Sequence, residues 1–197
     1  MAEVVAETAR LILRTWDFAD RALFTSLVNT PAVTRWLGGL QSEAEAEAAY
    51  DRLDSYQAEH GHTFWIVERK SDRALLGFCG LKRVNAPGAG PITGDFEIGW
   101  RLREDVWGQG YAKEAAIASL DLAFQRFGAP HVVALTVPGN VPSQGLMERL
   151  GMTRREDLDY VDTRFAHPSD INPAIVYWMS AADWPAARAA ALTERSS

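Results

Sequence analysis

The chain has 197 residues, 47% of them hydrophobic and 23% charged, so it can bury the core of one ordinary domain. Its net charge is −6 at pH 7 and it has no Lys/Arg-rich run, which argues against nucleic acid as a partner. No membrane partner and no signal peptide are expected, because no apolar run approaches about 18 residues and the start lacks a basic region.

The first third of the chain predicts one strand and two helices. Residues 9–14 predict a strand, in which Leu11 and Leu13 alternate on one face. A first helix follows and ends before Pro31, because the residue that precedes a proline avoids the helical region. A second helix begins at a capping box formed by Ser42 and Glu45, and Gly61 closes it.

The middle of the chain changes to the two-residue period of strands. Residues 64–67 and 75–81 predict two strands joined by a polar turn. Cys79 is the only cysteine, so no disulfide can form within the chain, and we expect a buried side chain in a reducing compartment, the cytoplasm. Proline and glycine predict a loop over 85–94. A strand over 95–102 follows, and one of its faces carries Asp95, Glu97, Gly99 and Arg101.

The rest of the chain predicts alternating helices and strands, which makes a single α/β domain with a mixed sheet over residues 1–197. Gly128 and Pro130 end the first of these helices, and the apolar strand after it has the pattern of a strand covered on both faces. The expected elements are a helix over 111–127, a strand over 132–137, a short helix from Asn140 to Gly151, strands over 152–160 and 174–180, and a final helix from Asp183.

The segment from Trp107 to Ala115 predicts a cradle for a diphosphate. Gly108 and Gly110 lie between a strand and the start of a long helix. The first N–H groups of a helix lack partners and carry partial positive charge, and glycine lets the backbone approach a phosphate closely. Backbone amides of residues 108–112 are therefore the candidate ligands, and a plain strand-to-helix turn is the alternative interpretation.

These residues resemble the GNAT superfamily of acetyl-CoA-dependent N-acetyltransferases, in particular the branch that includes the ribosomal-protein N-terminal acetyltransferases. The resemblance is carried by Glu97 to Trp100, by residues 107–115 and by Asn140 to Met152. It implies an α/β (α+β) fold with a mixed, mostly antiparallel sheet of about seven strands flanked by helices. It also implies acetyl-CoA as co-substrate and an amine acceptor, either a small molecule or the N-terminus of a peptide. Many relatives dimerise, so a homodimer is a further option.

The resemblance assigns the coenzyme to the glycine segment and its surroundings. The family's loop usually opens with Gln or Arg, and here Trp107 takes that place while Gly110 and Ala112 take the later ones. The family's asparagine contacts the pantetheine arm; here it is Asn140, for which an N-cap role is the simpler alternative. The residues expected to contact the coenzyme are Ile98, Gly99, Trp100, Trp107, Gly108, Gln109, Gly110, Tyr111, Ala112, Lys113, Asn140, Ser143 and Met147.

The implied reaction needs a base for the amine and a proton for the departing thiolate. Glu97 is expected to be the base, through a water, and a surface or ion-paired carboxylate is the alternative. Many relatives protonate the thiolate with a tyrosine seven residues after the asparagine, but Met147 stands there in this chain. Ser143 is the remaining candidate donor, and a second capping residue or water is its alternative.

Acceptor choice is expected to depend on loops. Arg35 and Trp36 lie in the region that forms the substrate rim in the family, although plain packing would also explain them. His167 lies in a loop near the expected substrate entrance. The four histidines are scattered, so no metal site is expected. A non-catalytic CoA-binding module is the alternative function, and a dinucleotide-binding domain is disfavoured because Lys113 stands where its third glycine would be.

Overall fold

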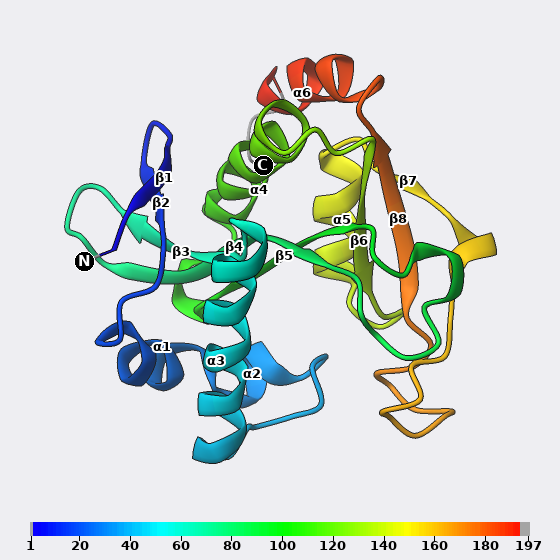
Figure 1. Ribbon diagram of the computed structural model, residues 1–197, viewed down its shortest axis with the longest axis horizontal. Coiled ribbons are helices and arrows are strands. Elements are labelled where there is room, and N and C mark those ends of the chain that lie inside the picture. The colour runs from blue at the N-terminus through cyan, green and yellow to red at the C-terminus, as the bar shows by residue number, and fades with distance from the viewer. Residues whose placement is uncertain (1, 194–197) are drawn as a thin grey trace. The chain divides into compact units, whose positions relative to one another are not determined.

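The computed structural model describes residues 2–193, and within them eight strands and six α-helices are found (Figure 1). The strands are β1 (Val4–Glu7), β2 (Leu11–Arg14), β3 (Phe64–Arg69), β4 (Leu75–Arg83), β5 (Phe96–Leu102), β6 (His131–Thr136), β7 (Thr153–Arg154) and β8 (Ile175–Ser180). The helices are α1 (Asp20–Val28), α2 (Pro31–Thr34), α3 (Glu43–His60), α4 (Tyr111–Asp121), α5 (Val141–Arg149) and α6 (Trp184–Thr193).

The strands form one sheet in the order β1-β2-β3-β4-β5-β6-β8-β7. The pairs β1–β2, β2–β3, β3–β4, β6–β8 and β7–β8 are antiparallel, and β5–β6 is parallel. The mixed, mostly antiparallel sheet expected from the sequence is therefore confirmed. The additional strand is β1, whose short apolar stretch at the start of the chain was not expected to pair.

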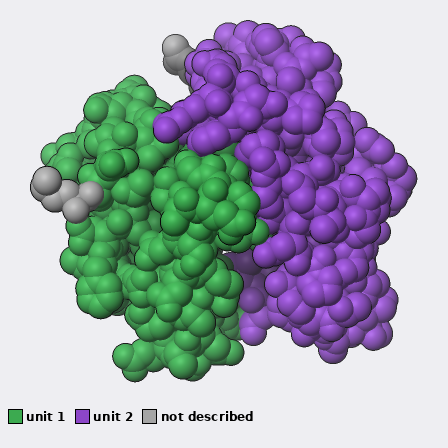
Figure 2. All heavy atoms as spheres, in the orientation of Figure 1, with its two compact units in different colours: residues 1–35, 39–82, 99–119 green, residues 36–38, 83–98, 120–197 purple. Residues whose placement is uncertain are grey.

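Contacts between residues divide the chain into two compact units (Figure 2). Unit 1 contains residues 1–35, 39–82 and 99–119, and unit 2 contains residues 36–38, 83–98 and 120–197. Strand β5 and helix α4 each contribute residues to both units. A single domain over the whole chain stays a prediction.

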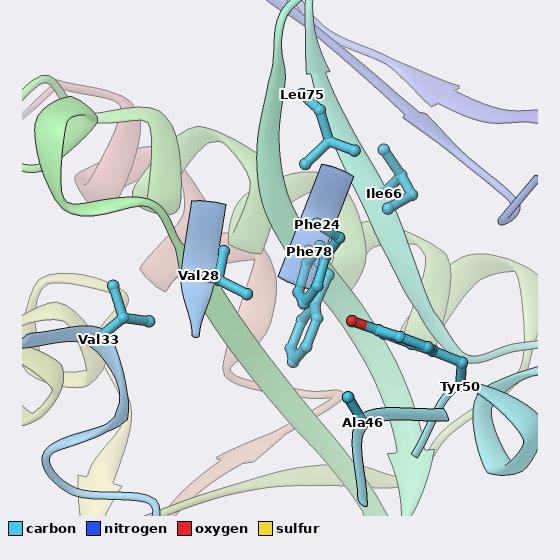
Figure 3. Close-up of a cluster of buried hydrophobic side chains, with 8 residues drawn as sticks. All are labelled: Phe24, Val28, Val33, Ala46, Tyr50, Ile66, Leu75 and Phe78. Atoms are coloured by element: carbon cyan, nitrogen blue, oxygen red, sulfur yellow. The ribbon is translucent and has the colours of Figure 1, made fainter. Parts of the chain in front are cut away.

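Unit 1 is built on the antiparallel meander β1–β4, and α1 and α3 cover one of its faces through an apolar cluster (Figure 3). The rings of Phe24 and Phe78 are stacked, with their centroids 5.5 Å apart and an interplanar angle of 4°. Each fully buried side chain of this size stabilises the fold by about 1.5–3 kcal/mol. The buried members are Phe24, Val28, Val33, Ala46, Tyr50, Ile66, Leu75 and Phe78.

Helix α4 covers the opposite face of β4 in unit 1. Neighbouring residues of a strand point to opposite faces, so Phe78, which packs with α1 and α3, and Cys79 face different ways. The sulfur of Cys79 lies 3.5 Å from the hydroxyl oxygen of Ser119 on α4. In this unit, one face of β4 is therefore covered by α1 and α3, and the opposite face is covered by α4.

Local sequence signals account for both ends of α3. Ser42 accepts a hydrogen bond from the N–H of Glu45 and the Glu45 carboxylate accepts one from the N–H of Ser42, which is the expected capping box. Gly61 ends the helix in the left-handed region at φ +70°. The long helix over 111–127 is only partly confirmed, because α4 ends at Asp121 and continues as a π-helical turn over 122–126.

Unit 2 is built around β6, which pairs with the first half of β5 on one side and with β8 on the other. Val133 of β6 and Val176 of β8 are fully buried in its apolar cluster. The strand expected over 152–160 is wrong in extent: only β7 is extended, and a helical turn over 156–158 follows it. Polar residues of that stretch, among them Glu156, interrupt the alternation that a longer strand needs.

Candidate active site

The glycine segment forms a tight turn into α4 (Figure 1). Gly108 and Gly110 have φ angles of +72° and +78°, a region that residues with a side chain rarely adopt. Among the residues that the structure describes, none accepts a hydrogen bond from the backbone N–H of any residue from 108 to 112. Five successive donors at the positive end of a helix dipole are therefore available to a bound anion.

Side chains around this turn hold it from the protein side. The indole N–H of Trp107 donates to the carbonyl of Leu102 at 2.9 Å, and the side-chain amide of Gln109 donates to the carbonyl of Asp105 at 3.1 Å. The ring of Tyr111 is buried beneath the guanidinium of Arg10, whose central carbon lies 4.4 Å from the ring centroid. Each of these contacts leaves the backbone N–H groups of the turn unpaired.

Arg10, from the turn between β1 and β2, ties the start of α4 to the sheet. Its Nη1 donates to the carbonyl of Gln109 at 2.9 Å, and its Nε donates to the carboxylate of Glu114 at 2.6 Å. Burial alone would raise the pKa of Glu114, but hydrogen bonds from Thr8 and Arg10 outweigh burial and lower that pKa. This tether joins residues far apart in the sequence, and sequence reasoning missed it.

Three of the expected coenzyme contacts lie on β5. Ile98 is 2% exposed and belongs to the core of unit 2. In unit 1, a Cβ added to Gly99 would lie 2.7 Å from Cζ of Phe64, so the aromatic ring packs directly on this backbone. Trp100 is half-buried. A side chain at position 99 would therefore require the Phe64 ring to move.

Glu97 is half-buried on the part of β5 that pairs with β6 in unit 2. Tyr160 lies close enough to be affected: burial, and then the negative charge of Glu97, raise the pKa of the Tyr160 phenol. The Arg164 guanidinium also responds to that charge, although its hydrogen bond to Asp162 dominates the rise of its pKa. The proximity of Tyr160 to the predicted base was not evident from the sequence, because a lone tyrosine in an expected strand carries no signal.

The start of α5 gathers the next group of expected residues in unit 2. The side-chain oxygen of Asn140 accepts a hydrogen bond from the N–H of Ser143 at 3.4 Å, so its capping role is confirmed. Ser143 is half-buried, and its hydroxyl makes no hydrogen bond within residues 2–193. Trp36 packs on the preceding turn, since a Cβ on Gly139 would lie 2.5 Å from its ring. Met147 is 2% exposed and occupies a core position.

The other expected residues are more peripheral. Arg35 is exposed at the end of α2, Lys113 is half-buried in the first turn of α4, and His167 is exposed in the loop before β8. Within the described part of the chain, His167 takes part in no hydrogen bond or ion pair. No group of His, Cys, Asp and Glu residues within 2–193 has the arrangement of a metal site. None of the helices described is long and apolar enough to cross a bilayer.

Comparison with known proteins agrees with this geometry. The Acetyltransferase (GNAT) domain family matches residues 10–153. The protein YkkB of Bacillus subtilis is 33% identical over 146 residues, which cover 74% of this chain and 83% of YkkB. A crystal structure of an acetyltransferase from Agrobacterium tumefaciens superposes with a TM-score of 0.72 at 25% identity, covering 88% of this chain and 92% of that one.

The chain therefore belongs to the GNAT family, and it is an acetyl-CoA-dependent acetyltransferase. Its fold is also that of RimL, a ribosomal L7/L12 α-N-protein acetyltransferase. The TM-score with RimL is 0.71 over 91% of this chain and 95% of that one, at 16% identity. That likeness concerns the fold alone.

Proposed function

We propose that the protein transfers the acetyl group of acetyl-CoA to a primary amine by direct aminolysis of the thioester, with the backbone amides of residues 108–112 holding the diphosphate. The observation that carries this proposal is the row of five N–H groups at the start of α4 that find no acceptor among residues 2–193. A helix N-terminus of this kind favours phosphate groups. The residues present therefore fit the coenzyme.

Glu97 is the proposed base in this reaction. It receives one proton of the amine through a water while the nitrogen–carbon bond forms, and the carbon–sulfur bond then breaks. The departing thiolate takes a proton from Ser143 or from water. A thiol with a pKa of about 8.5 leaves with little acid assistance, so Met147 in place of the family's tyrosine is compatible with turnover.

The acceptor is proposed to enter past Arg35, Trp36 and His167. A small amine and a peptide N-terminus are both compatible with this proposal, and the fold shared with RimL is a reason to include the peptide in any panel. We also propose that the chain forms a single domain, that it can form a homodimer and that it is located in the cytoplasm. The one cysteine is consistent with that location.

Two glycines with nearly equal backbone strain provide the test of the cradle. Gly108 and Gly61 have φ angles of +72° and +70°, and a Cβ at either would meet no atom within 4 Å. Gly108→Ala and Gly61→Ala should therefore lower the free energy of unfolding by similar amounts, about 1 kcal/mol. Calorimetric titration with CoA should show at least about tenfold weaker binding for Gly108→Ala alone. Equal affinities would exclude the cradle.

Release of free thiol from acetyl-CoA tests the reaction itself. The wild-type protein is mixed with acetyl-CoA and a panel of primary amines that includes polyamines, amino acids, amino sugars and short peptides. We expect amine-dependent thiol release with at least one class. Tight binding of CoA without thiol release on any amine would contradict the proposed transfer.

A further inference from the structure

Arg101 lies on β5 in unit 1, on the face that α1 and α3 cover. The central carbon of its guanidinium is 5.3 Å from the centroid of the Phe78 ring, which belongs to the apolar cluster beneath these helices. Phe64 stacks on Phe78 at 4.9 Å with an interplanar angle of 11°, and it covers the backbone at Gly99. The cation thus lies beside a continuous aromatic surface.

No acidic group among residues 2–193 pairs with this cation. Within residues 2–193 the guanidinium makes no hydrogen bond or ion pair, and its Nε is buried without an acceptor. Tyr50 interacts electrostatically with Arg101 but supplies no negative charge at pH 7, since the pKa of its phenol is raised further above the ordinary value of 10.0 by burial. Burial lowers the pKa of Arg101 to about 10, so the side chain is still charged at neutral pH.

The acidic side chains nearest to this cluster in sequence and fold are already paired. The guanidinium of Arg14 forms ion pairs with the carboxylate of Asp20, through Nη1 at 2.7 Å, and with that of Glu68, through Nε at 2.9 Å. Arg21 pairs with acidic residues of α3, among them Asp54 at 2.7 Å. A cation removed from water without an anionic partner is unfavourable by several kcal/mol, and the contact with the Phe78 ring offsets only part of that cost. A ligand anion would supply the missing partner.

The diphosphate of the coenzyme is not that anion. In unit 1 the α4 face of β4 lies opposite the α1/α3 face, as Cys79 and Phe78 show. The cradle belongs to the start of α4, whereas Arg101 contacts Phe78. The diphosphate therefore does not supply the partner of Arg101, and we assign that partner to the second substrate of the reaction, the acceptor.

We propose that Arg101 recognises a carboxylate of the acceptor, so that the acceptor is an amine whose apolar carbon chain also carries a carboxylate. A guanidinium presents two parallel N–H groups that match the two oxygens of a carboxylate. The half-buried ring of Phe64, which stacks on Phe78, would pack against the carbon chain. This inference rests on the proposed function, because the amine is what receives the acetyl group.

A chain-length series separates recognition of the carboxylate from recognition of the amine. The acceptors are ω-amino acids from glycine to 6-aminohexanoate, each paired with the alkylamine of equal length. The variants are Arg101→Gln and Arg103→Gln; the control, Arg103, lies next to the end of β5 and is paired with Asp105 at 2.6 Å. For the best ω-amino acid, kcat/KM should fall about 30-fold in Arg101→Gln and less than about threefold in Arg103→Gln.

The alkylamines distinguish failure of the inference from failure of the proposed function. Their kcat/KM should change less than about threefold in Arg101→Gln. If wild type acetylates alkylamines as well as ω-amino acids, or if Arg101→Gln slows both alike, the inference is wrong while acetyl transfer to amines stands. If neither kind is acetylated by wild type, the proposed function fails for these acceptors.

Binding of a simple carboxylate then decides the inference without turnover. Hexanoate and hexanamide serve as probes, and their affinities for wild type and Arg101→Gln are measured by titration followed by NMR. Wild type should bind hexanoate at least about tenfold more tightly than the variant, and hexanamide should bind both alike. Equal affinity of the two proteins for hexanoate would overturn the inference.

Discussion

The Nη1 of Arg10 donates a hydrogen bond to the carbonyl oxygen of Gln109, 2.9 Å away and 99 positions further along the chain. This bond holds the carbonyl on the side of the sheet, and the neighbouring N–H groups have no acceptor in the described part of the chain. The β1–β2 turn therefore holds the proposed diphosphate cradle in shape.

Removing this tether should weaken coenzyme binding. We expect Arg10→Gln to raise the dissociation constant of CoA about fivefold, which corresponds to ~1 kcal/mol for one hydrogen bond. The matched control is Arg155→Gln, which removes an exposed pair with Asp157 in unit 2. Calorimetric titration of both variants with CoA is the measurement, and an unchanged affinity in Arg10→Gln would show that the cradle holds its shape without the tether.

Replacing Glu97 should slow the reaction without releasing the coenzyme. Glu97→Gln keeps the size of the side chain but cannot accept a proton, so kcat at neutral pH should fall at least about tenfold. The affinity for acetyl-CoA should stay within about twofold of wild type. Steady-state assays with an accepted amine measure the first quantity and calorimetry the second, with Glu156→Gln as an exposed control. Unchanged turnover would remove Glu97 from the role of base.

Acid should weaken the fold in part through Glu114. Its folded pKa lies below the ordinary value of 4.5, so as the pH falls the unfolded chain takes up the proton first. The stability that Glu114 contributes is complete above the ordinary pKa of 4.5, and it is lost as the pH drops through the lower pKa of the folded protein. Urea unfolding between pH 6 and pH 3 should show a shallower loss of stability for Glu114→Gln than for wild type. Parallel curves would contradict this assignment.

Arg101 should be dispensable for stability. Because it has no partner among the described residues, Arg101→Gln removes an unfavourable buried charge and breaks no bond of the protein. The melting temperature should therefore equal or exceed that of wild type. A fall of several degrees would indicate that its contact with Phe78 supports the fold.

Cys79 should be inert in the folded protein. It is 0% exposed, and burial raises the pKa of its thiol from 9.0 to about 12. At pH 8 the thiolate fraction should be about a thousandfold lower than for an ordinary thiol, because each pKa unit changes it about tenfold. Reaction with a chromogenic disulfide should be undetectable over hours without denaturant and rapid in urea. Rapid reaction of the folded protein would show that β4 opens readily.

Much of the fold follows from short-range patterns. The Ser42–Glu45 capping box, the stop at Gly61 and the glycines before α4 were predictable, because each depends on residues within one helical turn. β1 was missed because four residues pair as a strand only when β2 is beside them. The π-helical turn after α4 was missed for the same kind of reason, since tertiary packing overrides helix propensity.

The family and the proposed cradle could be inferred from the residues alone, since two glycines at a helix start leave amides available wherever that helix lies. Which side chains find a hydrogen-bond partner depends on how the chain folds. Arg10 bonds to Gln109 and Glu114, which lie 99 and 104 positions further along the chain. Arg101 has no hydrogen-bond or ion-pair partner within residues 2–193. Arg10 precedes β2 and Arg101 lies on β5, and their roles differ because the pairing of charges depends on distances through space.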